Sequence, residues 1–79
     1  MDRSEILLQI QSIAQQVIQD PNIRLSEEMT SKDVDGWDSM ADVAITEEIK
    51  KHFAIKVSLR EMVSWDSIGD IIDCIEKKI

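Results

Sequence analysis

The chain has few of the residues on which extracellular, membrane-spanning and catalytic proteins depend. Among its 79 residues there is one cysteine, one histidine, one proline and no tyrosine. The single cysteine, Cys74, allows neither an intramolecular disulfide nor a thiolate metal cluster. No stretch approaches the ~20 apolar residues that span a bilayer, and the charged residues 1–5 do not resemble a signal peptide. We therefore expect a cytoplasmic protein that does not insert into a membrane.

Basic side chains are also scarce. Nine lysines and arginines face 16 aspartates and glutamates, which gives a formal net charge of −7. Such a protein is repelled by nucleic-acid phosphates and by anionic membranes, and it is attracted to basic protein surfaces. A catalytic domain of this size with one histidine and one cysteine would be unusual. The composition therefore favours a binding, carrier or interaction module.

The spacing of apolar residues predicts helices and no strand pair. With 43% hydrophobic residues, the chain can form one compact domain over residues 1–79. Apolar residues recur at helical spacing over 2–19, 39–53 and 67–79, and a capping box over 58–61 opens a short helix that ends near residue 64. The expected fold is all-α: a small four-helix bundle of three long helices and one short one.

Residues 21–38 form a long loop without periodicity, and a loop of this length in a small domain usually has a function. We expect four apolar residues to anchor the loop to the core, and the two tryptophans to serve as further anchors. The four residues are Ile23, Leu25, Met29 and Val34. Gly36 supplies a backbone conformation that other residues resist, just before the second long helix begins.

The candidate site is Gly36-Trp37-Asp38-Ser39-Met40, where the loop meets this helix. A serine at a helix N-terminus lies where unpaired backbone N–H groups and the positive end of the helix dipole favour an anion, such as a phosphate ester. The simpler interpretation is that Asp38 or Ser39 only caps the helix. The motif alone does not decide between these alternatives.

The arrangement of the whole chain resembles that of the acyl carrier protein family. The family has an acidic chain of this size with a long first helix, a long loop, and an Asp-Ser-Leu signature at the start of its second helix. Residues 36–40 look like this signature, with Met40 in place of leucine. Phe53 ends the second helix with an aromatic residue, as in the family, and residues 65–75 resemble the start and body of its last helix.

The resemblance implies that Ser39 is the attachment point of 4′-phosphopantetheine, transferred from coenzyme A by a phosphopantetheinyl transferase. The protein would then be a carrier and not an enzyme, holding acyl or aminoacyl groups as thioesters on the arm. The implied partners are this transferase and acyl-loading and acyl-using enzymes with basic surfaces, which a monomeric carrier would visit in turn. The residues expected to recognise them surround Ser39 or lie along the second helix: Trp37, Asp38, Met40, Asp42, Val43, Glu47 and Glu48. A long acyl chain is expected between the second and fourth helices, near Ile45, Ile68 and Ile72.

Departures from the family bear on the choice of partners. Ala44, Lys50 and Lys51 stand at positions where well-known fatty-acid carriers have glutamates. Mixed charge on this helix changes which partners are attracted and which are repelled. We therefore expect a carrier for fatty-acid-like or specialised lipid, polyketide or secondary-metabolite synthesis, and the departures favour a specialised pathway over housekeeping fatty-acid synthesis. The alternative is a helical protein-interaction module of the same fold that carries no arm.

Several other residues could be mistaken for sites. Ser67 repeats the Asp-Ser pair, but it follows a short helix, where a cap for the last helix is expected. Four loop residues and Asp42 partly match a calcium-binding EF-hand, although the opening aspartate is missing and the closing glutamate is replaced. The four are Ser31, Asp33, Asp35 and Gly36. We expect these acids to be solvated without forming a metal site, His52 to lie at the surface, and Cys74 to act as a small hydrophobic residue.

Overall fold

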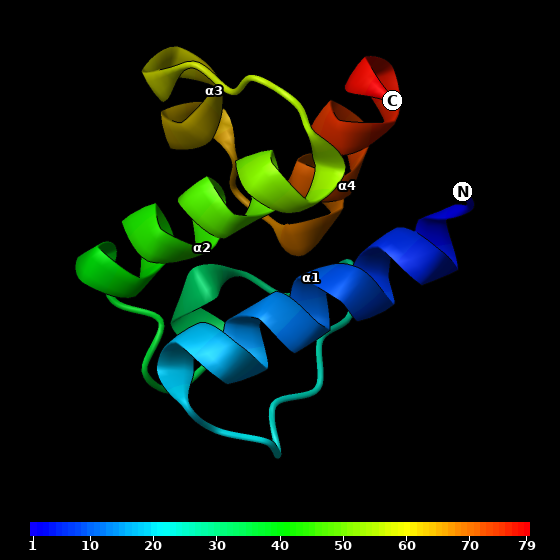
Figure 1. The fold of residues 1–79 in the computed structure, drawn as a ribbon. Coiled ribbons are helices and arrows are strands. Elements are labelled where there is room, and N and C mark those ends of the chain that lie inside the picture. The colour runs from blue at the N-terminus through cyan, green and yellow to red at the C-terminus, as the bar shows by residue number, and fades with distance from the viewer.

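Four α-helices and one turn of 3₁₀ helix form the fold, which a computed structural model describes over residues 1–79 (Figure 1). The α-helices are α1 (Arg3–Ile18), α2 (Ser39–Phe53), α3 (Leu59–Ser64) and α4 (Ile68–Lys78). The 3₁₀ turn η1 (Ser31–Asp33) lies in the long loop between α1 and α2. There are no strands, so the predicted all-α bundle of three long helices and one short one is confirmed. None of the helices is long and apolar enough to cross a membrane.

The helix ends follow from local sequence. The Asp2 carboxylate caps α1 by accepting a hydrogen bond from the Glu5 backbone N–H at 2.9 Å. The helix ends at Ile18, and the next residue, Gln19, adopts a left-handed conformation with φ of 62° just before Asp20-Pro21. The predicted capping box of Ser58 and Glu61 opens α3, with both of its hydrogen bonds formed. Each predicted helix therefore begins and ends within one or two residues of its expected position.

The core lies between α1, α2 and α4, and the loop contributes to it. Its members are almost all aliphatic: Ile6, Ile10, Ile13, Ala14, Ile23, Leu25, Val34, Trp37, Ile45, Ile49, Ile68, Ile71, Ile72 and Ile75. The predicted loop anchors are confirmed, since three of them are buried and Met29 packs against the core. The loop is further attached to α4 through backbone hydrogen bonds, because Ile68 N–H donates to the Met29 carbonyl at 2.8 Å and Gly69 N–H donates to the Glu27 carbonyl at 2.9 Å.

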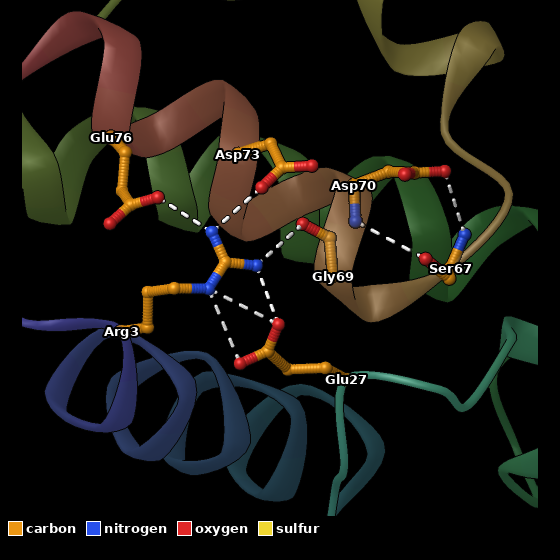
Figure 2. Close-up of polar contacts among 7 residues, drawn as sticks. All are labelled: Arg3, Glu27, Ser67, Gly69, Asp70, Asp73 and Glu76. Atoms are coloured by element: carbon orange, nitrogen blue, oxygen red, sulfur yellow. Dashed lines mark hydrogen bonds and ion pairs between the residues drawn. The ribbon is translucent and has the colours of Figure 1, made fainter.

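Arg3 joins the start of α1 to the loop and to α4 through three carboxylates (Figure 2). Its guanidinium nitrogens lie 2.5 Å from Glu27 Oε1, 2.7 Å from Asp73 Oδ1 and 2.6 Å from Glu76 Oε1. The hydrogen bond from Arg3 holds the pKa of the Glu27 carboxyl below its ordinary value, and these contacts raise the pKa of Arg3. One cation therefore holds together three acids that would otherwise repel one another.

Arg3→Ala is expected to destabilise the fold near neutral pH, because three neighbouring carboxylates lose their shared cation. The lowered pKa of Glu27 makes this contribution largest above the ordinary value of 4.5 and removes it as the pH falls through the folded-state pKa. The gap in thermal midpoint between wild type and variant should therefore narrow from about pH 7 to about pH 3. Lys77→Ala removes the same charge from an exposed site outside the cluster and is the control. A difference in thermal midpoint that does not change with pH would show that the loss of charge is not the cause of the destabilisation.

Candidate functional site: the start of helix α2

The end of the loop is held in place by Trp37. Gly36 has a φ of +87°, which turns the chain inward, and the Trp37 side chain that follows is only 7% exposed. The Trp37 indole Nε1–H donates a hydrogen bond to Asp42 Oδ1 at 2.9 Å, which joins the loop to the first turn of α2. The ring is thus part of the core, which confirms that Trp37 anchors the loop, while its expected contact with partner enzymes stays a prediction. The hydrogen bond to Asp42, unlike the anchoring, could not be read from the sequence.

The cap of α2 is Asp38 and not Ser39. The Asp38 carboxylate accepts a hydrogen bond from the Ala41 backbone N–H at 2.8 Å, and the Asp38 carbonyl accepts the first helical bond, from Asp42. Ser39 is the first residue of the helix, and its side chain is exposed. The two capping candidates that the sequence left open are therefore distinguished, and the hydroxyl of Ser39 is not used to cap the helix.

The surroundings of Ser39 suit an anion. The first backbone N–H groups of a helix have no partner within it, and they carry the positive end of the helix dipole. Ala41 N–H is taken by Asp38, whereas the N–H groups of Ser39 and Met40 precede the first helical hydrogen bond. A phosphate ester on Ser39 would lie beside these donors. The residues present therefore fit a phosphate-linked group.

Ser67, the other serine in an Asp-Ser pair, is in a different situation. Its hydroxyl accepts a hydrogen bond from Asp70 N–H at 3.2 Å, and the Asp70 carboxylate accepts from Ser67 N–H at 3.2 Å (Figure 2). The next two N–H groups of α4 donate to loop carbonyls, as described above. Both the hydroxyl and the helix N-terminus are thus occupied, which confirms the prediction that Ser67 is a structural cap.

Apolar and acidic side chains surround Ser39 on the surface. Met40 is 81% exposed and Val43 is 51% exposed, although both are hydrophobic. Asp38 is exposed, and Asp42 is half-buried against Trp37. The start of α2 therefore presents a small apolar surface with an acidic edge around the hydroxyl.

Further along α2 the charges are paired. Lys50 Nζ lies 3.2 Å from Glu47 Oε1, and Lys51 Nζ lies 3.8 Å from Glu48 Oε1. Both glutamates are exposed, but each has a cation beside it. Ala44 is exposed as well and adds no charge. The acidic character of α2 is therefore concentrated at its first turn.

The residues that partly match an EF-hand do not converge. Asp33 accepts a hydrogen bond from Thr30 N–H at 2.9 Å, Asp42 is bonded to Trp37, and Asp35 is exposed. No group of three or more histidine, cysteine, aspartate or glutamate side chains in the chain could hold a metal ion. Asp33 and Asp35 are exposed as expected, whereas Asp42 is half-buried and bonded to Trp37.

His52 and Cys74 lie as predicted. His52 is exposed near the end of α2, where its ring contacts Gln9 of α1 and the edge of Phe53. Cys74 is buried beside the core, its Sγ lies 3.6 Å from Glu61 Oε2, and burial raises the pKa of the thiol. A buried thiol of raised pKa is a poor nucleophile, so Cys74 acts as a packing residue.

Comparisons with known proteins identify the family. The model of the phosphopantetheine attachment site family matches residues 8–75. A holo acyl carrier protein from Geobacter metallireducens, solved in solution, is 32% identical with a TM-score of 0.83, covering 91% of this chain and 83% of that one. The crystal structure of an acyl carrier protein from Thermotoga maritima has the same fold, with 24% identity, a TM-score of 0.86 and coverage of 99% and 91%. Curated protein sequences gave no match. The chain therefore belongs to the phosphopantetheine attachment site family, and it is an acyl carrier protein rather than an enzyme.

Proposed function

We propose that Ser39 carries the 4′-phosphopantetheine group of this acyl carrier protein. The observation that supports this most strongly is the contrast between the two Asp-Ser serines. The hydroxyl of Ser39 is exposed and spared from capping, while that of Ser67 is bound to Asp70 N–H. A transferase can therefore reach Ser39 without opening a helix end.

The residues around Ser39 hold the attached group in place and leave its far end free. The open N–H groups at the start of α2 stabilise the phosphate, and the Asp38 carboxylate stays directed at Ala41 N–H, away from a direct clash with it. The bound arm supplies a thiol that carries acyl groups as thioesters. Its length places that thiol at a high effective concentration for each partner enzyme in turn.

A small acyl group fits the side of the bundle near Ser39. The side chains of Ile45, Ile68 and Ile72, between α2 and α4, are fully buried. A cavity of about 80 Å³ lies next to them, lined by the apolar side chains of Trp37, Met62, Trp65, Ile68 and Ile71 and by the polar residues Ser31, Asp42, Asp66 and Ser67. We propose that short acyl chains occupy this cavity and that longer ones enter between α2 and α4 after the core repacks. Unchanged NMR chemical shifts of Ile45, Ile68 and Ile72 on acylation would contradict this placement.

The partners of the site follow from its surface. The family implies a phosphopantetheinyl transferase and acyl-processing enzymes as partners. We propose that these enzymes contact Met40, Val43 and the acidic first turn of α2 through a basic surface. The paired charges of Glu47 and Glu48 favour a specialised biosynthetic pathway, because a uniformly basic partner gains little there. We place the carrier in the cytoplasm as a monomer.

The test is the intact mass of the purified protein after incubation with coenzyme A, magnesium and a broad-specificity phosphopantetheinyl transferase. We expect the mass to rise by one phosphopantetheine, and digestion to place the added group on the peptide that contains Ser39. An unchanged mass with a folded sample and a panel of transferases would instead support an interaction module without the arm. A modified peptide that lacks Ser39 would refute the proposed site alone.

A further inference from the structure

The middle of the chain reverses the charge of the rest. Residues 49–65 contain four basic side chains and one acidic one, whereas the remaining residues contain five basic and fifteen acidic ones. The four are Lys50, Lys51, Lys56 and Arg60. They lie on the end of α2, on the following loop and on α3. Lys50 and Lys51 are paired with Glu47 and Glu48, so the positive charge that remains unpaired is that of Lys56 and Arg60.

The single acid of this segment does not cancel that charge at the surface. Glu61 accepts hydrogen bonds from the Ser58 backbone N–H at 3.0 Å and from Lys78 Nζ at 3.3 Å. These contacts lower the pKa of Glu61 to about 2 and direct its carboxylate towards α4. Lys56 and Arg60, by contrast, are exposed and form no ion pair with an acid of this chain. Unpaired positive charge therefore lies in the loop before α3, at Lys56, and in the first turn of α3, at Arg60.

One exposed side of α3 is hydrophobic. Leu59 is 72% exposed and Val63 is 69% exposed, and the two are one helical turn apart, so they lie on the same face of α3. Arg60 lies between them in sequence and is exposed as well. The other side of α3 carries Met62, which lines a cavity together with core residues of α4. The exposed aliphatic pair therefore has no partner within the fold.

The α3 surface is a neighbour of the carrier site. Asp42 in the first turn of α2 and Met62 of α3 line the same cavity of about 80 Å³. Figure 1 shows α3 beside α2, joined to it by the loop that contains Lys56. An enzyme that approaches Ser39 can therefore contact both the acidic start of α2 and the unpaired cations at the start of α3.

We propose that Lys56, Leu59, Arg60 and Val63, together called the α3 face, dock a protein partner whose contact surface has an apolar centre and acidic side chains around it. Charge complementarity selects this partner, since Lys56 and Arg60 are exposed without ion pairs, and Arg60 shares a short helix with the exposed aliphatic pair. An anionic membrane or a nucleic acid is negative throughout, and the acids at the start of α2 and the net charge of −7 repel it. A protein surface can instead be basic opposite α2 and acidic opposite α3.

Docking at the α3 face does not require the arm, so it is tested on the unmodified protein. ¹⁵N-labelled protein is titrated with an amphipathic helical peptide that has a leucine stripe flanked by glutamates, and with the same peptide carrying lysines instead. We expect the acidic peptide to shift the amides of residues 56–63 and the basic peptide to shift those at the start of α2. Lys56→Glu combined with Arg60→Glu should weaken binding of the acidic peptide by about tenfold or more.

Control variants distinguish this docking from nonspecific hydrophobic binding. Leu8 on α1 is 60% exposed, so Leu8→Ser removes a comparable apolar side chain from another surface and should leave peptide affinity unchanged. Circular dichroism checks that each variant is folded. The proposal is overturned if the acidic peptide shifts other residues, if the charge reversal has no effect, or if phosphatidylglycerol vesicles shift residues 56–63 more strongly than the acidic peptide does.

Discussion

Ser39→Ala is expected to abolish modification by the transferase while the fold stays as stable as the wild type. The hydroxyl is the nucleophile of the proposed transfer, so its removal leaves no atom to accept the phosphate. Its loss costs the fold little, because Asp38 caps α2 and Ser39 is exposed. Alanine is moreover the best helix former. Intact mass and thermal unfolding together measure both parts of this expectation.

Ser67→Ala is the matched variant, and its expected result is the opposite one. The Ser67 hydroxyl accepts from Asp70 N–H within a capping box, and the loss of such a cap costs about 1 kcal/mol, within a range of about 0.5–2. The midpoint of unfolding should therefore fall, while the mass still rises by one phosphopantetheine. If Ser67→Ala blocked modification and Ser39→Ala did not, the two roles would be exchanged and the assignment of the site would be wrong.

The contrast between these serines shows which features of the site the sequence could predict and which it could not. Helical spacing and caps predicted the four helices because both are local, and the same local rules made Asp38 and Ser39 equally good caps. The choice between them is made by the backbone at Gly36 and by the burial of Trp37, which together decide where α2 begins. Whether the Ser39 hydroxyl is free to be modified therefore depends on tertiary structure, which local sequence rules do not describe.

Contacts between distant segments were beyond prediction for a similar reason. Arg3 contacts Glu27, Asp73 and Glu76. The chain has 16 acidic side chains, and the sequence gives no reason to choose these three as the partners of Arg3. The 3₁₀ turn over residues 31–33 is too short to leave a periodic pattern. The exposure of Leu59 and Val63 was also hidden, because sequence alone does not show which side of a six-residue helix meets the core.

Gly36→Ala is expected to destabilise the fold by about 2–4 kcal/mol, the largest loss of stability predicted for this chain. Two separate causes contribute. A φ of +87° strains any residue with a Cβ atom, and a Cβ built at this position lies 2.6 Å from Cγ2 of Ile18. That methyl group is attached to the branched Cβ of Ile18 and cannot swing away as the end of a long side chain could. Chemical denaturation measures the change in free energy of unfolding.

Gly69→Ala is the control within the same chain. Gly69 has ordinary helical backbone, and its added Cβ would meet the Glu27 carbonyl oxygen at 3.2 Å, which requires only a small shift. Alanine in a helix also gains up to about 1 kcal/mol over glycine, which offsets this contact. The change should therefore cost much less than Gly36→Ala, since it requires the Glu27 carbonyl to shift by only a few tenths of an ångström. Comparable losses at both glycines would mean that loss of flexibility in general, and not the geometry at Gly36, matters.

The two causes at Gly36 can be separated with Ile18→Ala. This change removes the Cγ2 atom that the new Cβ would meet, so Gly36→Ala should cost less in the Ile18→Ala background than in the wild type. The cost that remains, on the order of 1 kcal/mol or more, belongs to the positive φ. A cost that did not change would show that the close approach is relieved elsewhere. A reduced cost would instead show that the last residue of α1 fixes the turn from which α2, and with it Ser39, begins.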